Sequence, residues 1–93
     1  MTKHTISYIR ECIRSLNYVV SLHASEELDD DNLSILDLEN IILTGEIVER
    51  QRDRQTREVK SLVRGVTLAG DEAETVVKVG PSGTLLVITV YLV

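Results

Sequence analysis

Apolar residues recur at three- and four-residue steps in the first part of the chain, with charged residues between them. The stripe consists of Ile6, Ile9, Ile13 and Leu16. This period is typical of a helix that rests on a core with one face, so we predict a helix over residues 4–16. Residues 18–22 are rich in β-branched and aromatic side chains, which predicts a short strand.

A second helix is predicted after an acidic turn. Residues 23–28 are compatible with one or two helical turns, which residues 29–32 end, because Asp and Asn side chains bond to their own backbone. Ser34 then has the position of an N-cap, and Asp37 stands three residues later, as in a capping box. Gly45 is a natural stop for this helix.

From Gly45 onward the sequence favours strands, in four segments separated by turn-forming residues. These segments are residues 46–51, 58–68, 74–79 and 85–92. Because the connections are short, neighbouring strands must run antiparallel. We therefore predict one α+β domain over residues 1–93, in which two N-terminal helices pack on an antiparallel sheet of four to five strands.

The last predicted strand is apolar on both faces. Strict alternation places Leu86 and Val90 on one face and Val87, Thr89 and Tyr91 on the other. A strand of this kind is expected to be central in its sheet or covered on both sides.

Composition limits the function. With 93 residues, 43% of them hydrophobic, the chain is expected to form one domain with a modest core. A net charge of −5 disfavours a general nucleic-acid binder, so only a local basic patch could hold RNA. The single cysteine, Cys12, lies on the apolar stripe of the first helix and is expected in the core. It allows no internal disulfide, and no stretch is long and apolar enough for a membrane span, so we expect a cytoplasmic protein without membrane partners.

Charge is strongly segregated along the chain. Residues 15–49 contain no lysine or arginine, whereas residues 50–64 hold six basic side chains. These are Arg50, Arg52, Arg54, Arg57, Lys60 and Arg64. Side chains alternate between the two faces of a strand, so Lys60 and Arg64 share one face, and Arg50, Arg52 and Arg54 share a face of the preceding strand. We therefore expect all of these cations except Arg57, five in total, on one side of the sheet. The alternative is a solvated face with weak surface ion pairs.

Several chemistries are disfavoured by the sequence. One cysteine and two separated histidines do not suggest a zinc site, the acidic run lacks the spacing of a calcium loop, and no glycine loop precedes a helix as phosphate binding requires. We therefore expect no metal and no cofactor. His23 opens a polar turn, where an imidazole keeps the solvent access that proton transfer needs. Alternatively, its ring caps that turn, and Tyr91 is only a surface aromatic.

The order of short motifs resembles the prokaryotic domain-of-unknown-function family numbered 4258 over about residues 5–92. The motifs are His23-Ala24, Glu26, Leu28, Leu33-Ser34, Gly45-Glu46-Ile47-Val48-Glu49, Arg64-Gly65 and Ile88-Thr89-Val90-Tyr91. That family is similar in layout to RelE-like toxin ribonucleases, with helices before an antiparallel sheet. The resemblance implies that His23, Arg64 and Tyr91 match its most recurrent polar positions. One departure is that Glu27 and Leu28 stand where members commonly have Arg-Met, so a carboxylate replaces a cation beside His23.

Two hypotheses follow. The first is a metal-independent endoribonuclease of the RelE-like kind that acts on mRNA. Its catalytic residues would be His23, Arg64 and Tyr91, and Arg50, Arg52, Arg54 and Lys60 would contact RNA. Three tyrosines and no Phe or Trp offer few stacking platforms, so the ribosome would have to position the message. The second is a non-catalytic interaction domain whose basic edge binds an acidic partner, either an antitoxin protein or a second copy in a homodimer.

Overall fold

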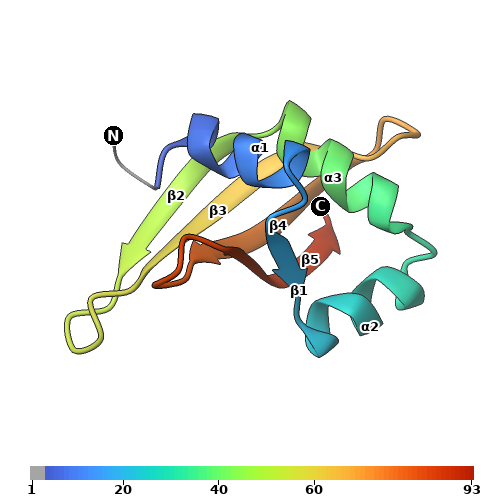
Figure 1. Cartoon of the computed structure of the whole chain (residues 1–93). Coiled ribbons are helices and arrows are strands. Elements are labelled where there is room, and N and C mark those ends of the chain that lie inside the picture. The colour runs from blue at the N-terminus through green and yellow to red at the C-terminus, as the bar shows by residue number, and fades with distance from the viewer. Residues whose placement is uncertain (1–3) are drawn as a thin grey trace.

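One five-stranded sheet forms the centre of the molecule, and two of three helices cover one of its faces (Figure 1). The computed structural model describes residues 4–93. In chain order the elements are α1 (Ile6–Arg14), β1 (Tyr18–Val20), α2 (Leu22–Asp30), α3 (Ile35–Thr44), β2 (Glu46–Arg52), β3 (Val59–Val66), β4 (Glu72–Val79) and β5 (Leu85–Leu92). The α+β class is therefore confirmed, with three helices instead of the two expected.

Each helix begins at a side chain that caps its first turn. Thr5 accepts a hydrogen bond from Tyr8 N, and Ser21 accepts one from Ala24 N. At α3 both bonds of the predicted capping box between Ser34 and Asp37 are present. The additional helix is α2, which continues to Asp30 because Ala24 and Leu28, four residues apart, are both buried against the core.

The sheet is mixed, in the order β1-β5-β4-β3-β2. Strands β2 to β5 form the antiparallel meander that the short turns predict. The expectation of a wholly antiparallel sheet is wrong, because β1 pairs parallel with β5. Two helices and three strands separate these partners along the chain, so a short turn does not fix their relative direction.

Two β-bulges shift the alternation of side chains. Val48 is an extra residue in β2, between Ile47, which pairs with Val63, and Glu49, which pairs with Leu62. Ile88 is an extra residue in β5, because Val77 pairs with Val87 whereas Val76 pairs with Thr89. Beyond a bulge, each following residue lies on the face opposite to the one that uninterrupted alternation assigns.

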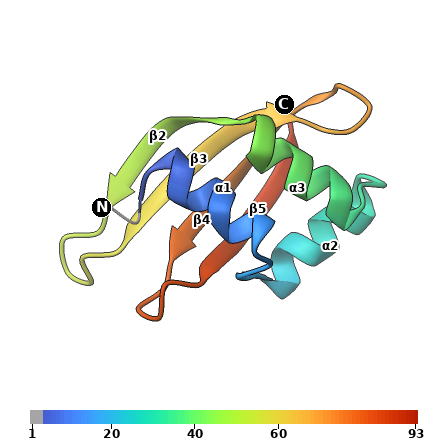
Figure 2. The same cartoon turned by 45° about the horizontal axis from the view of Figure 1, so that its top comes forward.

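The face of the sheet toward α1 and α3 carries the core (Figure 2). Ile9, Ile13, Leu38, Ile41 and Ile42 from these helices pack with Val63, Val77, Leu85, Val87 and Val90 from the sheet. The opposite face has no helix over it within residues 4–93, and we call it the open face. None of the described helices has the length and apolar character needed to cross a bilayer.

Candidate functional site

The predicted cations lie on two sides of the sheet. Arg50 pairs with Ser61 and Arg52 with Val59, both of which are buried on the helix side. Lys60 and Arg64 are exposed on the open face. The expectation of five cations on one side is therefore wrong. At the start of β2, Glu46 pairs with Arg64, and an unbroken register would place Arg50 opposite Lys60 on the open face. The bulge at Val48 shifts the register by one residue, so Arg50 pairs with Ser61 instead.

The remaining arginines surround the loop between β2 and β3. Arg50 donates a hydrogen bond to the carbonyl of His4 at 3.0 Å. Arg54 and Arg57 lie in the loop itself, which protrudes at one end of the molecule (Figure 1). In the described part of the chain, Arg52, Arg54 and Arg57 form no ion pair. Among residues 4–93 these three arginine side chains also have no hydrogen-bond partner, so we call them the free cations of the loop.

Arg64 and Tyr91 meet on the open face through a carboxylate that lies between them. Glu74 pairs with Arg64 of β3 on one side and with Tyr91 of β5 on the other. Arg64 Nε donates to Glu74 Oε2 at 2.7 Å, and Tyr91 Oη donates to Glu74 Oε1 at 2.8 Å. Glu74 is only 7% exposed, so this carboxylate holds the side chains of Arg64 and Tyr91 from a protected position.

The three groups stabilise one another in their present protonation states. Hydrogen bonds from Tyr91 and Arg64 lower the pKa of Glu74 below its ordinary value. The same carboxylate raises the pKa of Tyr91 and that of Arg64. At neutral pH the cluster therefore contains a guanidinium, a carboxylate and a phenol that keeps its proton.

Arg64 still has capacity to bind an anion. Its side chain is 45% exposed, and its Nε and Nη2 face Glu74 Oε2. Glu72 Oε1 lies 3.6 Å from Nε and is exposed, so it is a weak second partner. Among residues 4–93 no acceptor binds Nη1 of Arg64.

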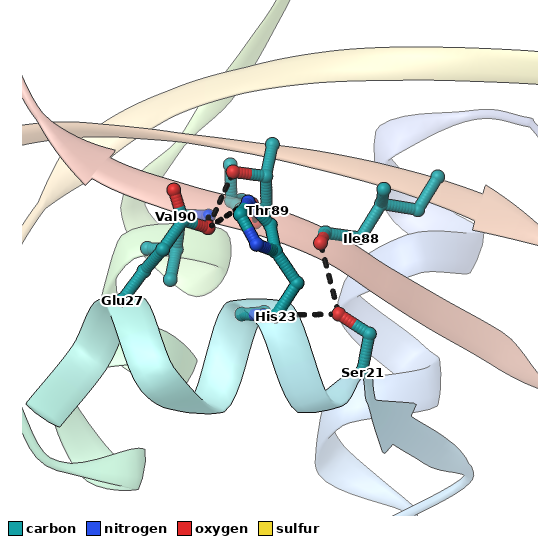
Figure 3. A network of polar contacts seen from close by, with 8 residues as sticks. Ser21, His23, Glu27, Ile88, Thr89 and Val90 are labelled. Carbon is teal, nitrogen blue, oxygen red and sulfur yellow. Dashed lines mark hydrogen bonds and ion pairs between the residues drawn. The ribbon is translucent and has the colours of Figure 1, made fainter.

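His23 lies on α2, and its side chain is 69% exposed. Its Nε2 is 3.5 Å from Glu27 Oε1, which also accepts hydrogen bonds from Thr89 Oγ1 and from Val90 N (Figure 3). Thr89 and Tyr91 project from the same face of β5, because they pair with Val76 and Glu74 of the open face. The imidazole is therefore linked through Glu27 to β5, the strand that also carries Tyr91, although His23 and the Arg64 cluster share no bonded residue.

Glu27 and Ser21 have a structural role at this edge of the sheet. Strand β1 ends at Val20, and beyond it β5 has no neighbouring strand on the side away from β4. Ser21 N donates to Val87 O. Ser21 Oγ donates to Ile88 O, and Glu27 accepts from Val90 N (Figure 3). These bonds satisfy polar backbone groups that an edge strand otherwise exposes.

A shallow hollow of ≈220 Å³ adjoins the cluster on the open face. Its lining residues are Glu49, Gln51, Lys60, Leu62, Val76 and Tyr91. Strands β2 to β5 all contribute to it, so it crosses most of the sheet.

Sequence reasoning missed Glu74. It placed a carboxylate, Glu27, beside His23 as the structure does, but it did not foresee that Glu27 also binds β5. A signal for Glu74 was present, since antiparallel pairing around the turn after β3 places a carboxylate directly opposite Arg64. The expected core position of Cys12 is confirmed, as the residue is 3% exposed. In the region from His4 to Val93, no group of three or more His, Cys, Asp or Glu side chains could hold a metal ion.

Comparison with known protein families gives one match. The model of the domain of unknown function DUF4258 matches residues 20–92, which is most of the chain. The chain belongs to this family. The match begins just before α2 and includes His23, the Arg64 cluster and the hollow. No curated protein and no solved structure matched the chain in the corresponding searches.

Proposed function

We propose that this protein is a metal-independent endoribonuclease of the RelE-like kind, which cleaves mRNA on the open face of its sheet. The strongest support comes from three neighbouring strands on the open face. Arg64 of β3 and Tyr91 of β5 both donate hydrogen bonds to Glu74 of β4, which lies between them. The proposal also draws on the order of elements, in which helices precede an antiparallel meander.

The reaction needs three kinds of group. The 2′-oxygen of a ribose loses its proton and attacks the adjacent phosphorus, and the 5′-oxygen leaves with a proton, which gives a 2′,3′-cyclic phosphate and a 5′-hydroxyl end. A cation must stabilise the charge on the phosphate as this occurs. Arg64 and Lys60 supply cations on the open face, and Arg64 has a free Nη1 group.

The remaining roles follow from position and protonation. Tyr91 keeps its proton because Glu74 raises its pKa, so it can donate a proton or stack with a base. His23 on α2 is solvent-exposed and serves as the proton-transfer residue of this proposal. Glu74 acts as a positioning residue, which orients Arg64 and Tyr91. Arg50 and Arg52 point to the helix side and have no part in the phosphate site of this proposal.

The test is cleavage of a messenger RNA by the purified protein, with and without ribosomes. We expect cuts that carry 2′,3′-cyclic phosphate ends, persist in the presence of a chelator, and decrease by about 100-fold in Arg64→Ala and His23→Ala. The control is Arg14→Ala, an exposed arginine of α1 on the helix side, which should cut normally. Intact RNA under all conditions would contradict the proposal, and full activity of His23→Ala alone would remove only the role of His23.

A second candidate function rests on a different observation, the free cations around the β2–β3 loop. The carboxylates of this segment are already engaged, because Asp53 accepts from Gln55 N and Thr56 N, and Glu58 pairs with Lys78. The acidic residues of α2 lie at the opposite end of the molecule (Figure 1). The loop is therefore suited to an acidic extended segment of a partner protein, such as an antitoxin.

A fluorescent glutamate-rich peptide tests this second candidate. We expect binding that weakens as salt rises from 50 to 300 mM and that is lost when Arg52, Arg54 and Arg57 are all changed to Ala. The control is the same change at Lys60, on the open face. Equal binding by both variants would contradict a loop site, and a salt-sensitive dimer of the free chain would indicate a second copy as the partner.

A further inference from the structure

The hollow beside the Arg64 cluster has the features of a nucleobase site. Leu62 and Val76 pair with each other across β3 and β4 and form an apolar floor. Tyr91 borders the hollow on one side, and Glu49, Gln51 and Lys60 border it on another. We propose that this hollow binds one unpaired guanine base of the RNA, an inference that deepens the proposed ribonuclease function and rests on it.

The floor and the tyrosine fit a flat aromatic ligand. Single-stranded RNA is commonly held by bases that leave the stack and lie against aromatic and apolar side chains. Tyr91 is 37% exposed, so part of its ring is free for such a contact. Its hydroxyl is fixed by Glu74, which prevents the ring from turning away.

The polar border selects the base. Glu49 is an acceptor only, and guanine is the one RNA base whose pairing edge carries two adjacent donors, N1–H and the N2 amino group. Gln51 Nε2 donates to Glu49 Oε2 at 2.9 Å, which orients the carboxylate and leaves its Oε1 without a partner in residues 4–93. The ammonium of Lys60 is a donor only and matches the O6 acceptor of guanine.

Glu49 has no other evident task, whereas Lys60 also lowers the pKa of Asp53 and of Glu58 through its charge. The ammonium of Lys60 has three donors, so it can contact a base and a phosphate together. Within the part of the chain that the structure describes, neither Glu49 nor Lys60 takes part in an ion pair. Glu49 reaches the open face only because the bulge at Val48 shifts the register, so that it pairs with Leu62 instead of the buried Ser61. The bulge thus delivers an acceptor to the hollow.

The hollow and the phosphate site are adjacent. Leu62 and Arg64 lie on the same face of β3, two residues apart, which corresponds to about 7 Å along a strand. A base on Leu62 and Val76 would therefore place a neighbouring phosphate near Nη1 of Arg64. Base recognition and phosphate binding would then involve one nucleotide or two consecutive ones.

Titration of ¹⁵N-labelled protein with each of the four nucleoside 5′-monophosphates tests the inference directly. We expect guanosine monophosphate to shift the amide signals of residues 49–51, 60–62, 76 and 91. It should bind about tenfold more tightly than adenosine monophosphate, the discrimination typical of a paired set of hydrogen bonds. Glu49→Gln, which replaces one acceptor oxygen by a donor, should remove this preference. Glu11→Gln, an exposed carboxylate of α1, is the matched control.

The outcomes separate this inference from the function on which it rests. Equal shifts with all four nucleotides, or none at these residues, would overturn the guanine site even if the protein cuts RNA. Selective guanosine binding by a protein that leaves RNA intact would support the site and contradict the ribonuclease proposal. If both hold, cuts mapped in mRNA should cluster beside guanines in the wild type and lose that preference in Glu49→Gln.

Discussion

The helix-covered face and the open face of the sheet take alternate residues of the same strands. In β3, Val63 is fully buried and Gly65 lies against α3, whereas Lys60 and Arg64 of the same strand are exposed to solvent. The covered face is closely packed and apolar, and the open face carries charged groups joined by hydrogen bonds. Folding and the candidate chemistry therefore depend on different residues of one strand, and substitutions can separate them.

The two bulges decide which residues belong to each face. In β2 the bulge sends Arg50 and Arg52 to the helix side and Glu49 to the open side. In β5 the bulge puts Val90 into the core and brings Thr89 and Tyr91 to the open side, beside Glu74. The extra residue in β2 thus moves Arg50 and Arg52 away from the open face, and the extra residue in β5 brings Tyr91 to it.

We expect the largest loss of stability from a substitution on the helix-covered face, at the close contact between β3 and α3. A Cβ on Gly65 would lie 2.0 Å from the carbonyl oxygen of Ile41, so α3 would have to move away from β3. We expect Gly65→Ala to lower the free energy of unfolding by about 3 kcal/mol. Urea denaturation measures this change.

Gly80→Ala is the control for Gly65→Ala, since the nearest atom to its Cβ would be 3.6 Å away. It should change stability by less than about 1 kcal/mol. Similar losses in the two variants would mean that the contact between α3 and β3 is not the cause.

A smaller effect is expected on the open face from Glu74→Gln. The amide cannot accept from both Arg64 and Tyr91 as the carboxylate does, so we expect a loss of about 1–2 kcal/mol. The pKa of Glu74 is lowered in the folded protein, so the unfolded chain takes up the proton first as pH falls. Its stabilising contribution is therefore complete above its ordinary pKa of 4.5 and is lost as pH falls through the lower folded value.

Comparison of wild type and Glu74→Gln by thermal unfolding between pH 2 and 7 isolates this contribution. The difference in stability should be constant near neutrality and shrink in acid. Asp37, Asp53 and Glu58 also have lowered pKa values, so the wild-type profile alone does not identify Glu74. A difference that grows toward acid pH would contradict the assignment.

The smallest expected effect is on the salt dependence of RNA binding, and it tests whether RNA contacts the cations of the open face or those of the helix side. Lys60→Ala should reduce the salt dependence of single-stranded RNA binding by about 0.7 in the slope of log K against log salt concentration, because one phosphate contact is lost. Arg52→Ala, on the helix side, should leave the slope unchanged. Fluorescence anisotropy at four salt concentrations measures both slopes. A loss of equal size in Arg52→Ala would show that RNA contacts both sides.

Local signals in the sequence predict the helices and strands well. The Ser34 and Asp37 capping box, the end of α3 at Gly45 and the meander of β2 to β5 are confirmed. Helix α2 was underestimated because most of its residues are polar and acidic, and only Ala24 and Leu28 signal its buried side. The parallel pairing of β1 with β5 depends on tertiary packing, which no local pattern encodes.

The candidate site is less predictable than the fold because it depends on register. Arg64 and Tyr91 could be selected from the sequence, but their common partner Glu74 becomes visible only when strands are paired. Val48 and Ile88 are β-branched residues, which are typical of regular strands, so the sequence does not indicate a bulge at either position. Parity arguments that cross such a residue give the wrong face, as they did for Arg50, Arg52 and Tyr91.

The side chains of Ser21 and Glu27 that close the second half of β5 also limit how copies of this domain can assemble. They leave only the three residues of β1 as a free edge on that side, whereas β2 offers seven at the other margin of the described sheet. The β2 margin therefore offers the longer edge for pairing with another strand, and two copies joined through β2 would present only their short β1 edges to a third.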